Sequence, residues 1–191
     1  MGKIVISTNV TLDGVVQDPD GKEDFDRGGW FTEFGNKDIP AWAELETQEA
    51  LEAEALLLGR RSDEWFASRW MSREGVWADR LNSMPKYIVS GTLEQPRWNR
   101  NATVLRGDVV KEISELKQKV TGEILVYASY QLGRALIEHD LADELRLTTY
   151  PVVLGGGARL FGDFPSRKPA RLIDVRALGE GLVFYAYAFV R

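Results

Sequence analysis

The chain has 191 residues, of which 44% are hydrophobic and 28% are charged, and its formal net charge is −5. This composition is typical of a globular protein with enough apolar material for one large core, so we expect a single domain over residues 1–191. The acidic balance argues against a nucleic-acid-binding face and against adhesion to an anionic membrane. With no cysteine and one histidine, the chain has neither disulfides nor thiolate nucleophiles, and we expect no metal site.

The N-terminal apolar run at residues 4–6 is too short for a signal peptide, and no run approaches the length needed to cross a bilayer. We therefore expect a cytoplasmic protein that binds a small molecule rather than a membrane or a nucleic acid.

Apolar, β-branched runs alternate with amphipathic segments along most of the chain. The first half predicts a strand at 3–8, an extended stretch with a turn at 10–16, and a loop at 17–34 that contains Trp30. It continues with a helix at 41–54 with a solvated Glu-rich face, a buried strand at 55–58, a helix from 63, a short helix at 77–83 and a buried strand at 86–90. The second half predicts strands at 103–105, 123–127, 144–154, 171–178 and 182–190, and helices at 109–120 and 130–138.

This alternation predicts an α/β fold with a mostly parallel sheet and helices on both faces. Only Gly179-Glu180-Gly181 separates the last two strands, which is too short for a crossover. These strands therefore form a C-terminal antiparallel hairpin, and the sheet is mixed.

The buried strand at 55–58 ends at Gly59, and Arg60, Arg61 and Ser62 follow at the expected start of a helix. Free backbone N–H groups at a helix start suit a phosphate, and two guanidinium groups can bind a second anion. The alternative interpretation is an ordinary surface arginine pair.

Three other strand exits carry small polar residues, and ligands of open α/β sheets bind beyond the carboxyl ends of the strands. Two helix starts and an arginine pair suit a dinucleotide with an extra ribose phosphate, which favours NADPH over NADH. Neither the Gly-x-Gly-x-x-Gly fingerprint nor a phosphate-binding loop ending in Gly-Lys-Ser/Thr is present. The three exits are 90–92, 128–131 and 155–157. The glycine cluster at 155–157 is equally compatible with an anion-binding turn and with an ordinary tight turn.

Several segments, in this order along nearly the whole chain, resemble the reductase domain of the bacterial bifunctional riboflavin-biosynthesis deaminase-reductase. They are TLDG at 11–14, LLGRRS at 57–62, PKYIVS at 85–90, DELRL at 143–147, PVVLGGG at 151–157 and RLF at 159–161. The resemblance implies a dihydrofolate-reductase-like three-layer fold, NADPH as cofactor and a homodimer, here without the zinc deaminase half.

The resemblance also implies residue roles. The adenosine 2′-phosphate would lie near Arg60 and Arg61, and the pyrophosphate on the helix that follows Ala128. That family usually has glycines at this turn, where backbone approaches phosphate closely. The chain instead has a Cβ at Ala128 and a ring at Tyr130, which crowd the site. The full cofactor-binding set is Gly59, Arg60, Arg61, Ser62, Ser90, Ala128, Ser129, Tyr130, Gln131, Gly155 and Gly156.

For the substrate, the resemblance implies a pocket bordered by Asp13 and Gly14, with Trp30 as a stacking wall. Reduction of a pteridine ring needs a proton, commonly supplied through a carboxylic acid, and Asp13 is the first candidate. The alternative for Asp13 is a turn residue bonded to nearby backbone.

Two functions follow as hypotheses. The first is an NADPH-dependent reductase that transfers hydride to a small pyrimidine- or pteridine-like substrate, resembling 5-amino-6-(5-phosphoribosylamino)uracil reductase or dihydrofolate reductase. The second, favoured by the altered turn at Ala128, is a non-catalytic nucleotide-binding or regulatory protein that retains the fold.

Overall fold

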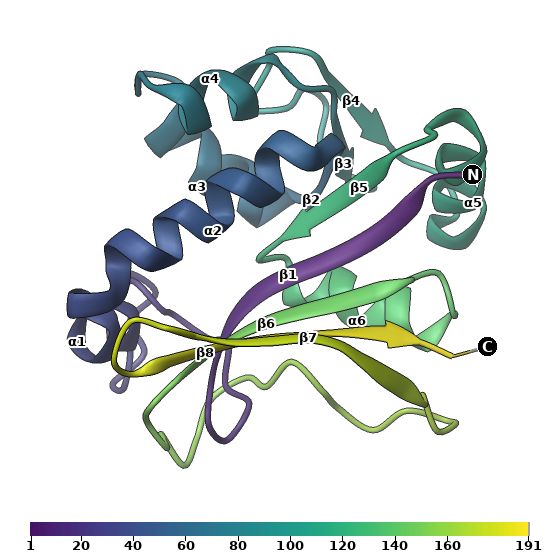
Figure 1. Ribbon diagram of the computed structural model, residues 1–191. Helices are drawn as coiled ribbons and strands as arrows, with labels where there is room; N and C mark the ends of the chain where they lie inside the picture. Colours follow the sequence, from purple (N-terminus) through teal and green to yellow (C-terminus); the bar gives the residue numbers. More distant parts are fainter. Residues whose placement is uncertain (191) are drawn as a thin grey trace.

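The computed structural model describes residues 1–190, whose eight strands form one sheet in the order β4-β3-β2-β5-β1-β6-β8-β7 (Figure 1). The strands from β4 to β6 in this order pair in parallel, whereas β8 pairs antiparallel with both β6 and β7. The strands are β1 (Lys3–Thr11), β2 (Ala53–Gly59), β3 (Lys86–Val89), β4 (Ala102–Leu105), β5 (Glu123–Tyr127), β6 (Glu144–Tyr150), β7 (Ala170–Leu178) and β8 (Leu182–Phe189).

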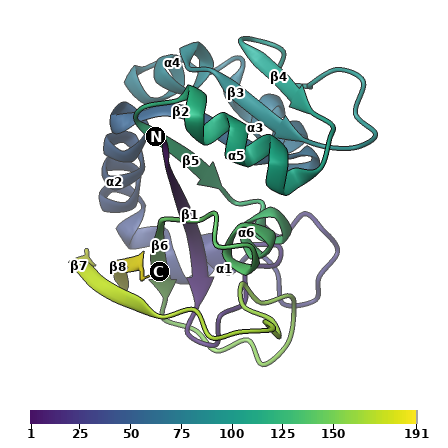
Figure 2. The same ribbon diagram turned by 90° about the vertical axis from the view of Figure 1, so that its right-hand side faces the viewer.

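Helices cover both faces of the sheet, and Figure 2 shows the strands between α2 on one side and α5 and α6 on the other. The helices α2, α3 and α4 pack on the first face, and α5 and α6 on the second. The helices are α1 (Trp30–Gly35), the 3-10 turn η1 (Asn36–Asp38), α2 (Ile39–Glu52), α3 (Arg60–Trp70), α4 (Val76–Ser83), α5 (Val109–Lys119) and α6 (Tyr130–Glu138).

The central strands are apolar on both faces because each face has its own helical layer. On β1, Ile4 and Ile6 belong to the cluster with α5 and α6, and Val5 between them belongs to the cluster with α2, α3 and α4. The same alternation on β5 places Leu125 on the α2 side. The predicted mixed α/β sheet, with helices on both faces and an antiparallel C-terminal hairpin, is confirmed.

Local differences from the expected elements have physical causes. The aromatic stretch expected as a loop is the short helix α1, whose first residue, Trp30, is buried. Helix α2 ends at Glu52 because Ala53 already pairs with Glu123 in the sheet. The strand expected over 144–154 ends at Tyr150, and the helix expected from Asp63 starts at Arg60.

The parallel pairing brings the carboxyl ends of β1, β2, β3, β5 and β6 to one edge of the sheet. The segments that follow these strands are those in which the sequence predicts ligand-binding residues. None of the helices in residues 1–190 is both long and apolar enough to cross a membrane.

Candidate active site

The starts of α3 and α6 are joined directly by hydrogen bonds. The Gly59 N–H donates to Ser129 Oγ at 3.0 Å, and the Ser129 N–H donates to Ser62 Oγ at 3.1 Å. The Oγ atoms of Ser129 and Ser62 are hydrogen-bonded to each other at 2.7 Å. Neither helix has a side-chain cap, so their first N–H groups keep the polarity that attracts an anion. Two of the segments predicted to bind phosphate are therefore neighbours.

The arginine pair lies at the same place. Arg60 contacts Glu64 at 2.9 Å and Thr92 Oγ1 at 3.3 Å, and its side chain is 52% exposed. Arg61 is exposed and has no hydrogen bond or ion pair with the other described residues. The Ser90 hydroxyl accepts from the N–H groups of Thr92 and Leu93, which shapes the loop beside Arg60. The exits at 59–62, 90–92 and 128–131 thus converge.

The turn before α6 adopts a backbone conformation that favours glycine. Ala128 has φ +48° and Ser129 has φ +50°, both in the left-handed region. This region costs a residue with a Cβ about 1–2 kcal/mol. The hydrogen bonds of Ser129 to Gly59 and Ser62 hold the turn in this conformation. The Tyr130 ring packs against the apolar cluster beneath α6, and Gln131 is exposed.

Asp13 fixes a loop rather than presenting a proton. Its carboxylate accepts hydrogen bonds from Thr11 at 2.7 Å, Gly155 N–H at 2.9 Å and Leu154 N–H at 3.2 Å, and pairs with Arg159 at 3.4 Å. Slight burial raises the pKa of Asp13, but these hydrogen bonds outweigh it and lower the pKa to about 2. The expectation that Asp13 protonates a substrate is therefore corrected, because the group is ionised at neutral pH.

The other residues of this loop lie around Asp13. Gly14 has φ +79°, and its carbonyl accepts from the Leu160 N–H at 2.9 Å, so it is a turn residue. Gly155 is bonded to Asp13, and Gly156 lies against the Arg27 guanidinium. Within residues 1–190, no hydrogen bond joins either glycine to the segment at 59–62.

Trp30 belongs to the core. Its side chain is fully buried, its Nε1 donates to the Gln17 carbonyl at 2.8 Å, and its ring meets Tyr150 edge-on at 5.2 Å. A ring without exposed surface has no face for a ligand, so the expectation of a stacking wall at Trp30 is corrected.

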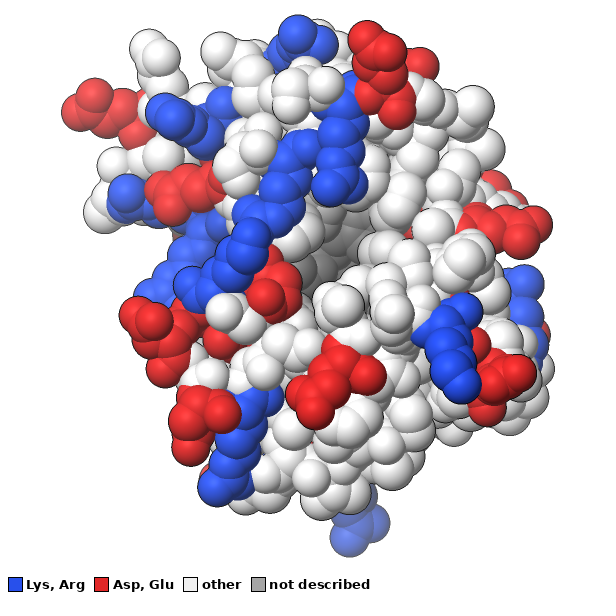
Figure 3. Space-filling model, turned by 90° about the vertical axis from the view of Figure 1, so that its left-hand side faces the viewer, with Lys and Arg blue, Asp and Glu red and all other residues white. Residues whose placement is uncertain are grey.

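The surface that carries the first four helices is hollowed near its centre, as Figure 3 shows. Lys and Arg side chains gather on the α3 side of this hollow. Helix α2 contributes none of them, because its only charged residues are glutamates. Lys and Arg side chains thus border the hollow on one side, with acidic side chains among them, and helix α2 adds no basic residue.

Aromatic rings in contact run across these helices from α1 to α3. Phe31 meets Trp42 at 4.8 Å, Trp42 meets Trp77 at 5.6 Å, and Trp77 meets Trp70 at 4.4 Å between ring centroids. Phe31, Trp42 and Trp77 are half-buried. The Trp42 Nε1 donates to Asn9 Oδ1 on β1 at 3.0 Å. Trp42 lies in the helix predicted at 41–54, and nothing in that pattern marked it as a site residue.

Glu46 is a buried carboxyl group on α2, although the sequence predicted a solvated acidic face. Glu46 is only 5% exposed, and the Tyr127 hydroxyl donates to the Glu46 backbone carbonyl at 3.0 Å. Burial and the neighbouring charge of Glu49 raise the pKa of Glu46 well above its ordinary value. Tyr127 is the last residue of β5 and immediately precedes Ala128. Glu46 is therefore a buried carboxyl group with a raised pKa, on a residue whose backbone is hydrogen-bonded to the last residue of β5.

The fold and this edge of the sheet define a dihydrofolate-reductase-like α/β protein. Over 98% of this chain and 96% of the other, the structure superposes on dihydrofolate reductase from Enterococcus faecalis with a TM-score of 0.58 and 14% identity. A putative riboflavin biosynthesis protein from Shewanella sp. PV-4 has a TM-score of 0.74 and 21% identity, with 99% of each chain covered.

The RibD C-terminal domain family matches residues 2–184, and the chain belongs to this family. The uncharacterized protein YyaP of Bacillus subtilis is 26% identical over 193 residues, covering 97% of this chain and 94% of YyaP. Because the family is a reductase domain, its membership supports an oxidoreductase and confirms the resemblance seen in the sequence.

We expect Ala128→Gly to raise the free energy of unfolding by about 1 kcal/mol, because it relieves the left-handed conformation. Urea unfolding followed by circular dichroism measures the change. Ala135→Gly, in the interior of helix α6, which follows this turn, is the control and should lower the free energy of unfolding by about 1 kcal/mol. An equal loss in both variants would contradict the strained turn.

Proposed function

We propose that the protein is an NADPH-dependent reductase that transfers hydride to a small pyrimidine- or pteridine-like substrate, as 5-amino-6-(5-phosphoribosylamino)uracil reductase and dihydrofolate reductase do. The observation that carries this proposal is the hydrogen-bonded junction of the α3 and α6 starts beside Arg60 and Arg61. Membership of a reductase family supports it, as does the E. faecalis dihydrofolate reductase, whose structure is a complex with NADP(H).

The residues present suit a dinucleotide with a 2′-phosphate. Arg61 has no competing partner within residues 1–190, and Arg60 is exposed, so both guanidinium groups can bind the extra phosphate. The uncapped first turns of α3 and α6 offer backbone N–H groups to the pyrophosphate. The hydrogen bond between Ser62 and Ser129 holds these two helix starts together, and Ser90 shapes the adjoining loop. NADPH, when bound, supplies a hydride from the nicotinamide C4.

For the substrate, this proposal uses the half-buried rings of Phe31 and Trp42 as a surface on which a flat heterocycle stacks. Glu46 is the proton donor, because burial and the charge of Glu49 favour the protonated form of its carboxyl group. Asp13 joins the loop after β1, which contains Gly14, to the loop after β6 through the N–H groups of Leu154 and Gly155. These roles replace those first expected for Trp30 and Asp13.

Substituting both arginines (Arg60→Ala with Arg61→Ala) should weaken NADPH binding by about 100-fold or more, because each charge-assisted hydrogen bond contributes about 1.5–3 kcal/mol. NADH lacks the 2′-phosphate, so its affinity should change little. Quenching of tryptophan fluorescence measures both affinities.

Arg167→Ala is the control for the loss of an exposed arginine, since Arg167 lies on the loop before β7, outside these segments. Equal losses for NADPH and NADH would contradict the assignment of Arg60 and Arg61. Failure of the unmodified protein to bind either nucleotide at millimolar concentration would remove the reductase proposal.

The rate of NADPH oxidation tests whether Glu46 is the proton donor. We expect the protein to oxidise NADPH, followed at 340 nm, in the presence of at least one compound from a panel of pteridines and aminopyrimidinediones. Glu46→Gln should lower kcat about 100-fold or more, because general acid catalysis contributes about 10²–10⁴. NADPH affinity should be retained in this variant.

Glu44→Gln, on the exposed side of the same helix, is the matched control and should keep its kcat. A Glu46→Gln variant with unchanged kcat would exclude Glu46 as the donor. NADPH binding without turnover of any compound in the panel would instead support the non-catalytic nucleotide-binding protein.

We also propose that the single domain over residues 1–191 forms a homodimer through β7, at the end of the sheet. This strand is exposed along most of its length, and Leu172, Ile173 and Val175 are 47%, 42% and 57% exposed. An apolar patch on an edge strand is typical of a protein interface. The cytoplasmic location stays a prediction.

Val175→Glu should convert the dimer to a monomer, because it places a charge inside the apolar patch. Sedimentation velocity measures the change, with Val153→Glu, at an exposed valine in the loop after β6, as control. A monomeric unmodified protein, or equal dissociation in both variants, would rule out this interface.

A further inference from the structure

Asn9 is a partly exposed polar residue in an otherwise buried strand. From Ile4 to Thr11, every residue of β1 is buried except Asn9, which is half-buried. Its side chain is on the α2 side of the sheet, because the Trp42 Nε1 on α2 donates to Asn9 Oδ1 at 3.0 Å. Asparagine is disfavoured in strands, so a site in the middle of β1 calls for a reason. The reaction proposed above does not use this residue.

The sheet is open on one side of Asn9. Strand β5 pairs with β1 only as far as Tyr127, which is opposite Ser7, and the chain then turns into α6. On its other side β1 continues beside β6, where Asn9 is opposite Thr148. Asn9 is therefore two residues beyond the end of β5, at the edge of the sheet that holds the carboxyl ends of the parallel strands. The proposed cofactor site lies at this same edge.

The Trp42 indole fixes the direction of the Asn9 carboxamide. An indole N–H can only donate, so the atom that it meets is Oδ1, the one acceptor of the carboxamide. Among residues 1–190, Nδ2 has no acceptor. Nor is Nδ2 enclosed, because the buried polar atoms without a partner in this part of the chain belong to four other side chains. The two N–H hydrogens of Nδ2 thus remain available to a ligand.

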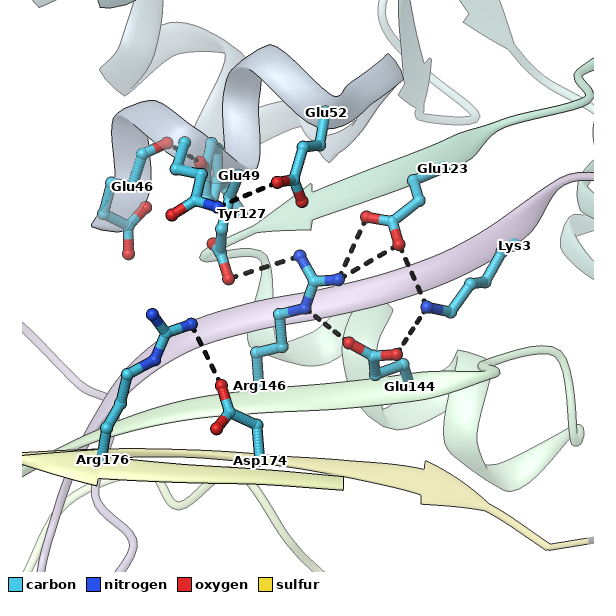
Figure 4. A network of polar contacts seen from close by, with 11 residues as sticks. Lys3, Glu46, Glu49, Glu52, Glu123, Tyr127, Glu144, Arg146, Asp174 and Arg176 are labelled. Carbon is cyan, nitrogen blue, oxygen red and sulfur yellow. Dashed lines mark hydrogen bonds and ion pairs between the residues drawn. The ribbon is translucent and has the colours of Figure 1, made fainter. Parts of the chain in front are cut away.

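The carboxamide lies among the groups that the proposed function assigns to the substrate. Trp42 carries one of the two rings on which the heterocycle stacks, and Phe31 carries the other, with 4.8 Å between the ring centroids. Glu46, the proposed proton donor, is four residues beyond Trp42, on the same side of α2. Figure 4 shows the carboxyl group of Glu46 apart from the neighbouring ion pairs. Asn9 therefore adds a hydrogen-bond donor beside an aromatic surface.

A carboxamide oriented in this way discriminates between ring substituents. The group that it leaves free is a donor, so it can bond an exocyclic carbonyl oxygen but cannot bond the hydrogens of an amino group at the same place. A mismatched substituent leaves polar groups of both the site and the ligand unpaired, which weakens binding. The structure thus favours ring systems that carry oxo groups over those that carry amino groups.

We propose that Asn9 is a specificity-determining residue, which selects a heterocycle with an exocyclic carbonyl oxygen by donating to that oxygen from Nδ2. This inference rests on the proposed function for the stacking of a flat heterocycle on Phe31 and Trp42. It narrows the substrate class from pyrimidine- or pteridine-like compounds to oxo-pyrimidines and oxo-pteridines. Asn9 takes no part in the transfer of hydride or of a proton.

Lumazine (pteridine-2,4-dione) and 2,4-diaminopteridine share a ring system and differ in these substituents, so they are the probes. Isothermal titration calorimetry, with and without saturating NADP⁺, should show that lumazine binds about tenfold or more tightly than 2,4-diaminopteridine. Asn9→Asp keeps an oxygen for the Trp42 N–H and replaces the free donor with an acceptor. This variant should therefore reverse the preference, so that 2,4-diaminopteridine becomes the tighter ligand.

Asn99→Asp makes the same chemical change at an exposed residue in the loop between β3 and β4, and it should keep the preference for lumazine. A second measurement, on the unmodified protein, covers the case in which Asn9→Asp does not fold. In a nitrogen-15-labelled sample, lumazine should shift the side-chain amide signals of Asn9 and leave those of Asn99 unchanged.

Four results would each overturn the role of Asn9: no binding of either pteridine, equal affinity for both, an unchanged preference in Asn9→Asp, or unmoved Asn9 signals. A loss of NADPH affinity in Asn9→Asp with an unchanged pteridine preference would also overturn it, because the amide would then bind the cofactor. Failure of the reductase proposal is recognised separately. The unmodified protein would then bind no nucleotide, whereas its preference between the two pteridines is measured without one.

Discussion

The candidate active site depends on the hydrogen bonds that Ser129 makes with Gly59 and Ser62. These bonds can form because β2 and β5 are parallel neighbours, so their carboxyl ends emerge side by side. They hold two helix starts together, and they also keep Ala128 and Ser129 in a conformation that side chains disfavour. Ala128 and Ser129 therefore adopt left-handed backbone at a turn where the family resemblance implies glycines.

Helix α2 carries two buried carboxyl groups. Glu46 and Glu49 are one turn apart and both face the sheet, but their surroundings differ. Glu46 lies beside Tyr127 and Trp42, near the carboxyl ends of the strands, whereas Glu49 lies beside Arg146, toward the amino ends. Burial, and after it the charge of Glu49, raises the pKa of Glu46, the proposed proton donor.

The errors of sequence interpretation share a cause. Asp13 and Trp30 were placed at the substrate by the resemblance, but their roles depend on partners more than a hundred residues away, Gly155 for Asp13 and Tyr150 for Trp30. The glutamates of α2 were predicted to be solvated because glutamate is rarely buried. Arg146 on β6 is a partner for Glu49, and no local pattern connects the two residues.

The sequence by itself determined the order of the strands and of the helices from α2 onward, the mixed sheet and the helix start at Ser129, because hydrophobic periodicity and turn residues are local properties. It also contained the family resemblance that the RibD C-terminal domain match confirms. Only the tertiary structure decided which polar groups have partners, which tryptophans are covered and which carboxyl groups are buried. These properties depend on contacts between distant segments, because the environment of a side chain is set by whatever packs against it.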